Sequence, residues 1–510
     1  MAGIEPLAVW LDRRAVASPE RAALEFAGRR VSYRALGERA GLLAEGLRRR
    51  RIGRGDRVAF LGHNRPEQIE LLFACARLGA MLVPLNWRLA PPEWLYILRH
   101  AEAAAIVAEP EFRGGVDAIV GELPALQRFA IGAAGGVWRR YDSLIDGSGG
   151  LASPAGALDD PVLLVYTSGT TGRPKGALLT QAALGWNARN SIAFHALAPA
   201  DRVLTFLPMF HVGGLNIQTV PALAAGAEVL LHRRFDAGQA LAAIARDRPT
   251  LTLMVPAVMK ALVEHPAWPS TDLSSLRMAS AGSSIVPLEL IRAFHARGVP
   301  VTQVYGSTET APIAIALGPA DARRKEGSTG LPAAHCRARI VDEAGNDVAR
   351  GTRGEILIRG PNVTAGYWRD PDATAAALAD GWFRTGDIGH QDDDGYYWID
   401  DRKIDVIISG GENVYPAELE AILGELPEIA QAAVVARPDP RWGEVPVAVV
   451  TAAAGARVDA ERVRAAFRDR VARFKQPRDV VVLERMPTTA LGKIAKGELR
   501  AMLAGAAKRG

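Results

Sequence analysis

The chain has 510 residues, 49% of them hydrophobic, and this length predicts two or three domains with buried cores. The formal net charge is +5, and the one dense basic cluster, residues 48–51, is typical of a solvated helix end, so the composition does not favour nucleic-acid binding. Cys75 and Cys336 fit no disulfide or zinc pattern, no apolar run reaches the roughly 18 residues of a membrane span, and the N-terminus lacks a signal-peptide pattern, so we expect a cytoplasmic protein.

The first 160 residues alternate between helix-like and strand-like stretches. Residues 35–50 and 68–78 have helical periodicity, whereas residues 57–61 and 80–84 are short and apolar. This alternation predicts an α/β fold. Residues 111–160 are rich in Gly, Ala and Pro and weakly patterned, so we expect loops there.

Residues 166–175 read YTSGTTGRPK and separate two apolar, strand-like runs. Gly169 and Gly172 allow the backbone to turn its N–H groups toward an anion, the hydroxyl side chains add donors, and Lys175 adds a point charge. The pattern therefore predicts a phosphate-binding loop between two strands. It is not a Walker loop, in which the lysine directly follows the second glycine and a helix comes next. The alternative is a surface hairpin that binds no ligand.

An apolar strand is predicted at residues 204–208, and it leads into MFHVGGLN at residues 209–216. A lone histidine is more often a core residue than a functional one, but Gly213 and Gly214 leave space beside His211.

Polar motifs close the next two predicted strands, SAGSS at residues 280–284 and QVYGSTET at residues 303–310. Ligands bind at the carboxyl ends of strands in open α/β sheets. Glu309 offers the hard oxygen that Mg²⁺ prefers, and Asp387, in WFRTGD, is suited to accept two ribose hydroxyl groups. Taken alone, each motif is also compatible with a plain turn.

The C-terminal region repeats the α/β alternation, with strand-like residues 432–435 and 447–451 and a helical stretch at 460–474. RWGE at residues 441–444 and RFKQPR at 473–478 combine aromatic and basic side chains, which suit an adenine ring and phosphates. The alternative is an exposed basic turn. Lys493 lies in a Gly-containing loop, where an ordinary lysine would be solvated.

In this order, from about Trp10 to Arg500, the motifs resemble those of the adenylate-forming superfamily: acyl-CoA synthetases, luciferases and peptide-synthetase adenylation domains. The chain is most similar to bacterial fatty-acyl-CoA and feruloyl-CoA synthetases. The resemblance implies an α/β fold with a large N-terminal domain of several subdomains, residues 1–400, and a small mobile α+β C-terminal domain, residues 401–510.

The resemblance implies an ATP-dependent carboxylic acid:CoA ligase that forms an acyl-adenylate, using ATP, Mg²⁺ and CoA. The acid would be a fatty or an aryl, cinnamate-like acid, and a homodimer is compatible with the family. Two alternatives remain: an adenylating enzyme with an acceptor other than CoA, and a non-catalytic nucleotide-binding protein.

The resemblance also implies residue roles. Catalysis is assigned to Lys493, Lys175, Thr308 and Glu309, with Glu309 also as the metal ligand. ATP binding is assigned to Thr167, Ser168, Gly169, Thr170, Thr171, Gly172, Lys175, Gly282, Ser283, Ser284, Tyr305, Gly306, Thr308, Asp387, Arg402 and Lys493. The acyl pocket is assigned to His211, Val212, Gly213 and Gln303. CoA binding is assigned to Arg88, Gly410, Gly411, Trp442, Phe474, Lys475 and Arg478.

Two features set this chain apart. The hinge before the small domain, Arg402, Lys403 and Ile404, has isoleucine where the family usually has Asp or Lys, which leaves a polar hinge contact in doubt. Residues 210–215 contain no carboxylate, although a site for amino acids normally pairs the buried ammonium with one. This disfavours an amino-acid substrate.

Overall fold

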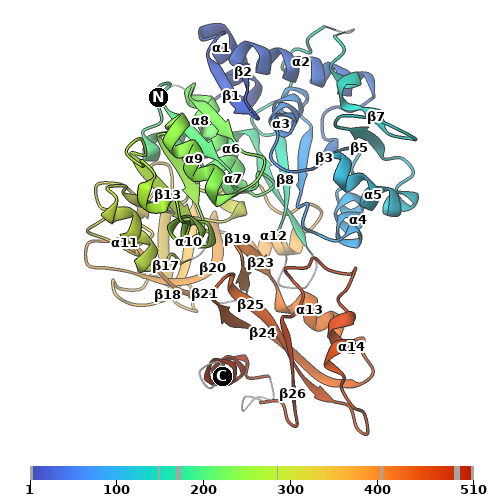
Figure 1. Ribbon diagram of the computed structural model, residues 1–510, viewed down its shortest axis with the longest axis vertical. Helices are drawn as coiled ribbons and strands as arrows, with labels where there is room; N and C mark the ends of the chain where they lie inside the picture. Colours follow the sequence, from blue (N-terminus) through green and yellow to red (C-terminus); the bar gives the residue numbers. More distant parts are fainter. Residues whose placement is uncertain are drawn as a thin grey trace. The chain divides into compact units, whose positions relative to one another are not determined.

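The computed structural model describes residues 4–147, 150–167, 174–283, 285–402, 406–487 and 494–506 (Figure 1). The chain divides into two compact units. The larger unit comprises Met1–Trp87, Leu98–Tyr166 and Gly176–Asp401, and the smaller comprises Arg88–Ile97, Thr167–Lys175 and Arg402–Gly510. The predicted α/β class, with a large N-terminal and a small C-terminal domain, is confirmed, whereas the exact ranges 1–400 and 401–510 stay a prediction.

One sheet of the larger unit has the strand order β16-β15-β14-β13-β12-β10-β11-β1-β2. Its strands are β1 (Ala22–Phe26), β2 (Arg29–Ser32), β10 (Arg202–Thr205), β11 (Glu228–Leu231), β12 (Leu251–Met254), β13 (Met278–Gly282), β14 (Val301–Tyr305), β15 (Ile315–Leu317) and β16 (Leu331–Pro332). From β14 to β1 neighbouring strands are parallel. The carboxyl ends of β10 to β14 therefore lie along one edge, which is where ligands bind in such sheets.

A second sheet has the order β7-β6-β5-β3-β4-β8-β9. Its strands are β3 (Arg57–Leu61), β4 (Met81–Leu85), β5 (Ala105–Ala108), β6 (Gln127–Ala130), β7 (Arg139–Arg140), β8 (Pro161–Thr167) and β9 (Lys175–Thr180). The strands predicted at residues 57–61 and 80–84 are confirmed as β3 and β4.

A third sheet is built from β17 (Arg337–Val341), β18 (Gly354–Arg359), β19 (Leu378–Ala379), β20 (Trp382–Gln391) and β21 (Tyr397–Arg402). The strand order in this sheet is β17-β18-β20-β19, and β21 also pairs with β20.

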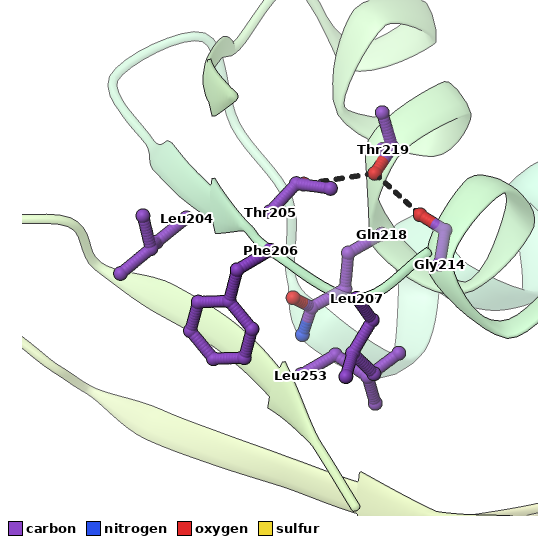
Figure 2. A pocket seen from close by; sticks show the side chains of 8 residues that line it. All are labelled: Leu204, Thr205, Phe206, Leu207, Gly214, Gln218, Thr219 and Leu253. Carbon is purple, nitrogen blue, oxygen red and sulfur yellow. Dashed lines mark hydrogen bonds between the residues drawn. The ribbon is translucent and has the colours of Figure 1, made fainter. Parts of the chain in front are cut away.

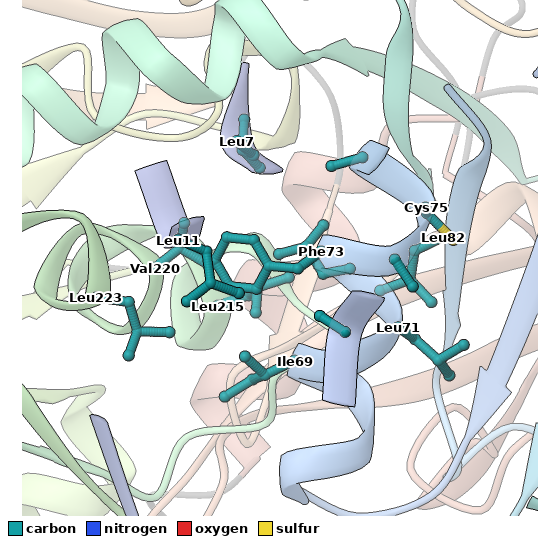
Figure 3. Packing of buried hydrophobic residues seen from close by; sticks show 14 of the residues in the cluster. Leu7, Leu11, Ile69, Leu71, Phe73, Cys75, Leu82, Leu215, Val220 and Leu223 are labelled. Carbon is teal, nitrogen blue, oxygen red and sulfur yellow. The ribbon is translucent and has the colours of Figure 1, made fainter. Parts of the chain in front are cut away.

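Helices of the larger unit cover these sheets. They are α1 (Leu7–Ala17), α2 (Tyr33–Arg49), α3 (Pro66–Leu78), α5 (Pro110–Ile119), α6 (Gln181–His195), α7 (Val212–Gly214), α8 (Val220–Ala225), α9 (Ala237–Asp247), α10 (Pro256–Val263), α11 (Leu288–Ala296) and α12 (Pro371–Ala377); α4 (Pro91–His100) spans both units. The main core joins α1, α2, α3 and α8 to strands of the first two sheets. Figure 3 shows Phe73 of α3 among Leu11, Leu215 and Val220. Cys75 lies in the same core, and burial raises the pKa of its thiol to about 12.

A single π-helical turn, η3 (Leu215–Thr219), interrupts the helical segment between α7 and α8. Such turns are rare in proteins, and many of those that occur lie at functional sites. Behind it, β13 presents its two faces to different partners: Ser280 bonds to α6 and η3, whereas Ala279 and Ala281 pack in the core of α9, α10 and α11. The π-turn therefore lies over the centre of the first sheet.

The sheet of the smaller unit contains β22 (Ile407–Ser409), β23 (Glu412–Val414), β24 (Ile429–Asp439), β25 (Gly443–Ala452) and β26 (Asp479–Leu483). Alternate residues of β24 and β25 face opposite sides, as a strand period of two requires. Val434 and Val450 pack with α13 (Pro416–Leu423) and α14 (Ala460–Ala465), while Val435 and Val449 pack with α15 (Lys496–Ala506). This small α+β unit thus has a helix layer on each face.

Two sequence-based expectations were wrong in part. Residues 111–160 are not loops throughout: α5 buries Val116 and Ile119, and β6 extends the second sheet beside β5. The helix expected at 460–474 ends at Ala465, and Asp469 then takes a left-handed φ of 60°, which a helix cannot contain. None of the helices in the described ranges is long and apolar enough to cross a membrane.

Candidate functional site

The carboxyl ends of β13 and β14 bring together residues predicted to bind a nucleotide. Gly282 ends β13, where a Cβ atom would lie 2.5 Å from the carbonyl oxygen of Val304, so a side chain does not fit. Tyr305 ends β14, and its hydroxyl group donates a hydrogen bond of 2.8 Å to Asp387 Oδ2 on β20. Two candidates 82 positions apart in sequence are therefore held side by side.

The turn after β14 is sterically constrained. A Cβ atom on Gly306 would lie 1.7 Å from the carbonyl oxygen of Pro312, so only glycine fits there. The next residues form the 3-10 turn η5 (Thr308–Thr310), and the backbone N–H of Ser307 donates to Thr310 Oγ1 at 3.0 Å. This turn fixes Thr308 and Glu309 at the ligand-binding edge of the sheet.

Glu309 is linked to the strand that leaves the predicted phosphate loop. Its side chain is buried, and its Oε1 accepts a hydrogen bond of 2.9 Å from the Tyr367 hydroxyl group. The N–H of Thr364 donates to the Glu309 carbonyl at 2.6 Å, and the Thr364 hydroxyl donates to the carbonyl of Leu178, in β9, at 2.7 Å. Because Oε2 receives no hydrogen bond from the described part of the chain, this carboxylate fits the predicted role of a Mg²⁺ ligand.

The phosphate loop itself, with Ser168, Gly169, Thr170, Thr171 and Gly172, lies outside the described residues. Its two ends are described: Thr167 ends β8 and Lys175 begins β9, so the strands predicted before and after it are confirmed. The Thr167 hydroxyl group donates to the carbonyl of Lys175 at 3.5 Å. Predicted residues are therefore present at both ends of the loop.

The predicted acyl pocket adjoins the nucleotide edge. His211 precedes α7, which begins at Val212, and a Cβ atom on Gly213 would have its nearest neighbour, Ser283 Oγ, at 4.0 Å. The space beside Gly213 is open, as predicted. Gly214 does not contribute to it, because a Cβ atom there would lie 2.3 Å from the carbonyl oxygen of Pro208.

Sequence reasoning assigned Gln303 to the acyl pocket but missed two buried polar residues of the π-turn, Asn216 and Gln218. Among the described residues, Gln303 Nε2, Gln218 Oε1 and both amide atoms of Asn216 are buried without a hydrogen-bond partner. Buried polar groups normally have partners, so such exceptions call for an explanation. The available signal was the placement of polar residues at 216, 218 and 219 within an otherwise apolar run.

In the smaller unit, four residues predicted to bind CoA form one neighbourhood. Gly410 and Gly411 turn the chain between β22 and β23 with φ of 60° and 85°, which favours glycine. A Cβ atom on Gly410 would lie 2.9 Å from the ring of the half-exposed Trp442. Arg88 forms an ion pair with Glu412, the residue that follows Gly411.

Lys475 has a different environment from the one expected of a CoA-phosphate contact. Its ammonium is buried and bonds to Glu93 Oε1 at 2.6 Å and to both Glu418 oxygens at 2.9 and 3.0 Å. Burial alone would lower the pKa of Lys475, but the charges of Glu93 and Glu418 outweigh it and raise this pKa. Burial raises the pKa of Glu418 despite the lysine. All three ammonium donors have acceptors, so we propose a structural role in place of the CoA contact.

The remaining candidates are less informative. Phe474 packs against the core of the smaller unit, and the N–H of Arg478 donates to the carbonyl of Pro446 at 2.7 Å. Arg402 ends β21, and its side chain is not described. Ser284, Lys403, Ile404 and Lys493 lie outside the described residues.

Comparison with known proteins gives two family matches. The model of the AMP-binding enzyme family matches residues 11–368, and the model of the AMP-binding enzyme C-terminal domain matches residues 418–493.

Individual relatives match over nearly the whole chain. The chain is 51% identical to an indoleacetate–CoA ligase from Aromatoleum aromaticum, covering 98% of both chains. It is 43% identical to a feruloyl-CoA synthase from an Amycolatopsis species, covering 97% of this chain and 98% of that protein. The solved structure of an amide bond synthetase from Marinactinospora thermotolerans is similar with a TM-score of 0.89 and 32% identity, covering 98% of this chain and all of that one.

Proposed function

This chain belongs to the AMP-binding enzyme family, and on that premise we propose that it is an ATP-dependent carboxylic acid:CoA ligase that works through an acyl-adenylate. The observation that carries the proposal is the adjacency of two half-sites. The open space beside Gly213 faces Ser283, at the end of β13, next to the Tyr305–Asp387 pair. An acid in that space has its carboxylate beside a nucleotide bound at the sheet edge.

In the first half-reaction, a carboxylate oxygen of the acid attacks the α-phosphorus of ATP, and the bond to the departing pyrophosphate breaks. We assign Asp387 to the ribose hydroxyl groups and Lys175, with the phosphate loop, to the phosphates. Glu309 would hold Mg²⁺, which neutralises phosphate charge when bound. Lys493 would stabilise the charge that develops on the α-phosphate. Catalysis then rests on positioning and electrostatics.

In the second half-reaction, the CoA sulfur attacks the acyl carbonyl carbon and AMP leaves. We assign the neighbourhood of Arg88, Gly410, Gly411 and Trp442 to CoA, because it combines a cation, an aromatic face and a glycine turn. Residues 402–404 would serve as the hinge between the two steps, since a hinge needs only a few residues that absorb backbone rotation. A cytoplasmic site of action fits a supply of ATP and CoA, and a homodimer stays a prediction.

We propose an aromatic acid as the substrate, because relatives at 51% and 43% identity are named for indoleacetate and ferulate, which are aromatic acids. The amide bond synthetase is less similar, at 32% identity. The similarity to that synthetase supports a second candidate, transfer of the adenylated acyl group to an amine. The two candidate functions differ in the molecule that must be present for AMP to be released: CoA for the ligase and an amine for the synthetase.

A panel of acids tests the function. With ATP, Mg²⁺ and CoA, we expect aromatic acids to give acyl-CoA, AMP and pyrophosphate. Amino acids such as phenylalanine should give none, because residues 210–215 offer no carboxylate and an unpaired buried ammonium costs several kcal/mol. Liquid chromatography of the thioesters measures the result. Strong pyrophosphate exchange driven by amino acids would contradict this expectation, and ATP binding without exchange for any acid would favour a non-catalytic protein.

A further inference from the structure

A small cavity lies beneath the π-helical turn, with room for about one water-sized group (Figure 2). Leu207, Phe206 and Leu253 form apolar walls, and the polar lining comes from Thr205, Gln218 and Thr219. Figure 2 shows the Gln218 side-chain amide projecting between Phe206 and Leu253. Gln218 is 2% exposed, and its Oε1 has no hydrogen-bond partner in the described part of the chain.

A chain of hydrogen bonds runs from His195 through Ser280 to Gln218, and the donor and the acceptor of each bond can be assigned. Burial lowers the pKa of His195 to about 3, so the ring is neutral and carries one N–H. Its Nδ1 lies 3.0 Å from the carbonyl oxygen of Ser191, which can only accept, so Nδ1 bears the hydrogen. Its Nε2 must then accept from Ser280 Oγ, at 3.0 Å. The single hydroxyl hydrogen of Ser280 is therefore already used.

This fixes the orientation of the Gln218 amide. The amide group facing Ser280 Oγ, at 3.2 Å, must be a donor, because Ser280 has no hydrogen left to give. The same group faces the carbonyl oxygen of Thr252 at 3.4 Å, which also can only accept. Both observations place Nε2 on that side, so the unpartnered atom in the cavity wall is the carbonyl oxygen Oε1.

The two threonines of the wall have also used their hydrogens. The Thr219 hydroxyl donates to the carbonyl oxygen of Gly214 at 2.7 Å, so the 2.8 Å contact between the two hydroxyl groups requires Thr205 to donate to Thr219. Every polar side chain that lines the cavity can thus only accept. The cavity is complementary to a group that donates a hydrogen bond, and a carbonyl, nitro or halogen substituent would meet only acceptors there.

One residue of the cavity lining adjoins the proposed acyl site in the chain. Gly214 lines the cavity and directly follows Gly213, which faces Ser283. Ser280, which holds the Gln218 amide, precedes Gly282 by two residues on β13, and at about 3.3 Å per residue this places it roughly 7 Å below the nucleotide edge. That depth is comparable to the length of an aromatic ring system.

We propose that this cavity is the far end of the acyl site and that Gln218 Oε1 accepts a hydrogen bond from a ring N–H or phenolic O–H group of an aromatic acid. The inference rests on the proposed function and narrows its substrate class. Gln218 would select among acids, because an acid without the donor leaves a buried acceptor unpaired.

The test compares matched acids that differ in one donor: indole-3-acetate with benzothiophene-3-acetate, and 4-hydroxycinnamate with 4-methylcinnamate. The comparison uses the pair of acids with the higher kcat/KM. Within that pair, the wild-type protein should favour the acid that carries the ring donor by about tenfold or more in kcat/KM. Gln218→Met should bring this ratio close to one, mainly by lowering kcat/KM for the donor acid. Gln68→Met is the matched control, since Gln68 is similarly buried, bonds to the Met209 carbonyl and does not line the cavity, and it should keep the wild-type ratio.

Several results would overturn the inference. One is a wild-type ratio near one, as expected if the cavity only holds a water molecule. Another is equal loss of activity toward both acids in Gln218→Met, and a third is activity restricted to acids without a ring donor. The wild-type ratio decides the matter even if Gln218→Met fails to fold. Absence of CoA-thioester formation with every acid would instead refute the proposed function.

Discussion

Replacement of Lys493 by alanine should slow acyl-adenylate formation by about 100-fold or more, the usual scale for losing one charged stabiliser of a transition state. Thioester formation from supplied acyl-adenylate should remain near the wild-type rate, because the charge on the α-phosphate develops only in the first step. The two rates are measured separately, as acid-dependent pyrophosphate exchange and as CoA consumption with synthetic acyl-adenylate.

The structure offers a matched control for this variant. Lys496 lies three residues further on, at the start of α15, and its ammonium pairs with Glu420 at 2.8 Å. The N–H of Ala495 donates to the carbonyl of Pro487 at 2.9 Å, so described residues on either side of the segment that contains Lys493 are hydrogen-bonded to each other. Lys496→Ala should therefore keep most of the adenylation rate. Equal loss of both half-reactions in Lys493→Ala would refute the assignment of this lysine to the first step.

Replacement of Lys475 by methionine should lower the free energy of unfolding by about 3–5 kcal/mol, because Glu93 and Glu418 would be left buried without their cation. Urea unfolding measures the loss. The KM for CoA should change little, since the ammonium already has its acceptors. A large rise in this KM with unchanged stability would restore the predicted CoA contact.

The pH dependence of stability gives a second readout for Lys475. Its pKa is raised on folding, so its contribution is complete below the unfolded-state pKa, near 10.5, and is lost as pH rises through the higher folded-state value. The alkaline loss of stability should be smaller in Lys475→Met. The triple variant Glu93→Gln, Glu418→Gln, Lys475→Met should recover part of the stability, because it removes all the buried charges together.

The sequence predicted what depends on local pattern. Strand β3 was placed at its observed bounds, and the turn carrying Glu309 was placed at the end of a strand. Short apolar runs indicate strands and glycines indicate turns, so both features can be located from the local sequence. By contrast, β6 packs its Phe129 into a core that is assembled from distant parts of the chain, and composition alone does not contain that information.

The site was predictable to a different degree. Motifs located Tyr305 and Asp387 separately, but only the fold brings them within hydrogen-bond distance. From the sequence, the charge of Lys475 suggested a contact with a ligand. The two carboxylates that neutralise this charge lie 382 and 57 positions away in the chain, so the local sequence does not reveal them. The orientation of the Gln218 amide could not be predicted from the sequence, because it is set by a hydrogen-bond network that begins at His195, on another helix.

The central claim is that the carboxylate of an acid attacks the α-phosphorus of ATP. The most direct measurement uses an acid labelled with oxygen-18 in its carboxylate, together with ATP, Mg²⁺, CoA and the wild-type protein, followed by mass spectrometry of the nucleotide products. The account predicts that each turnover transfers a single labelled oxygen atom to AMP. Label appearing in inorganic phosphate alongside ADP, or AMP carrying no label, would contradict it.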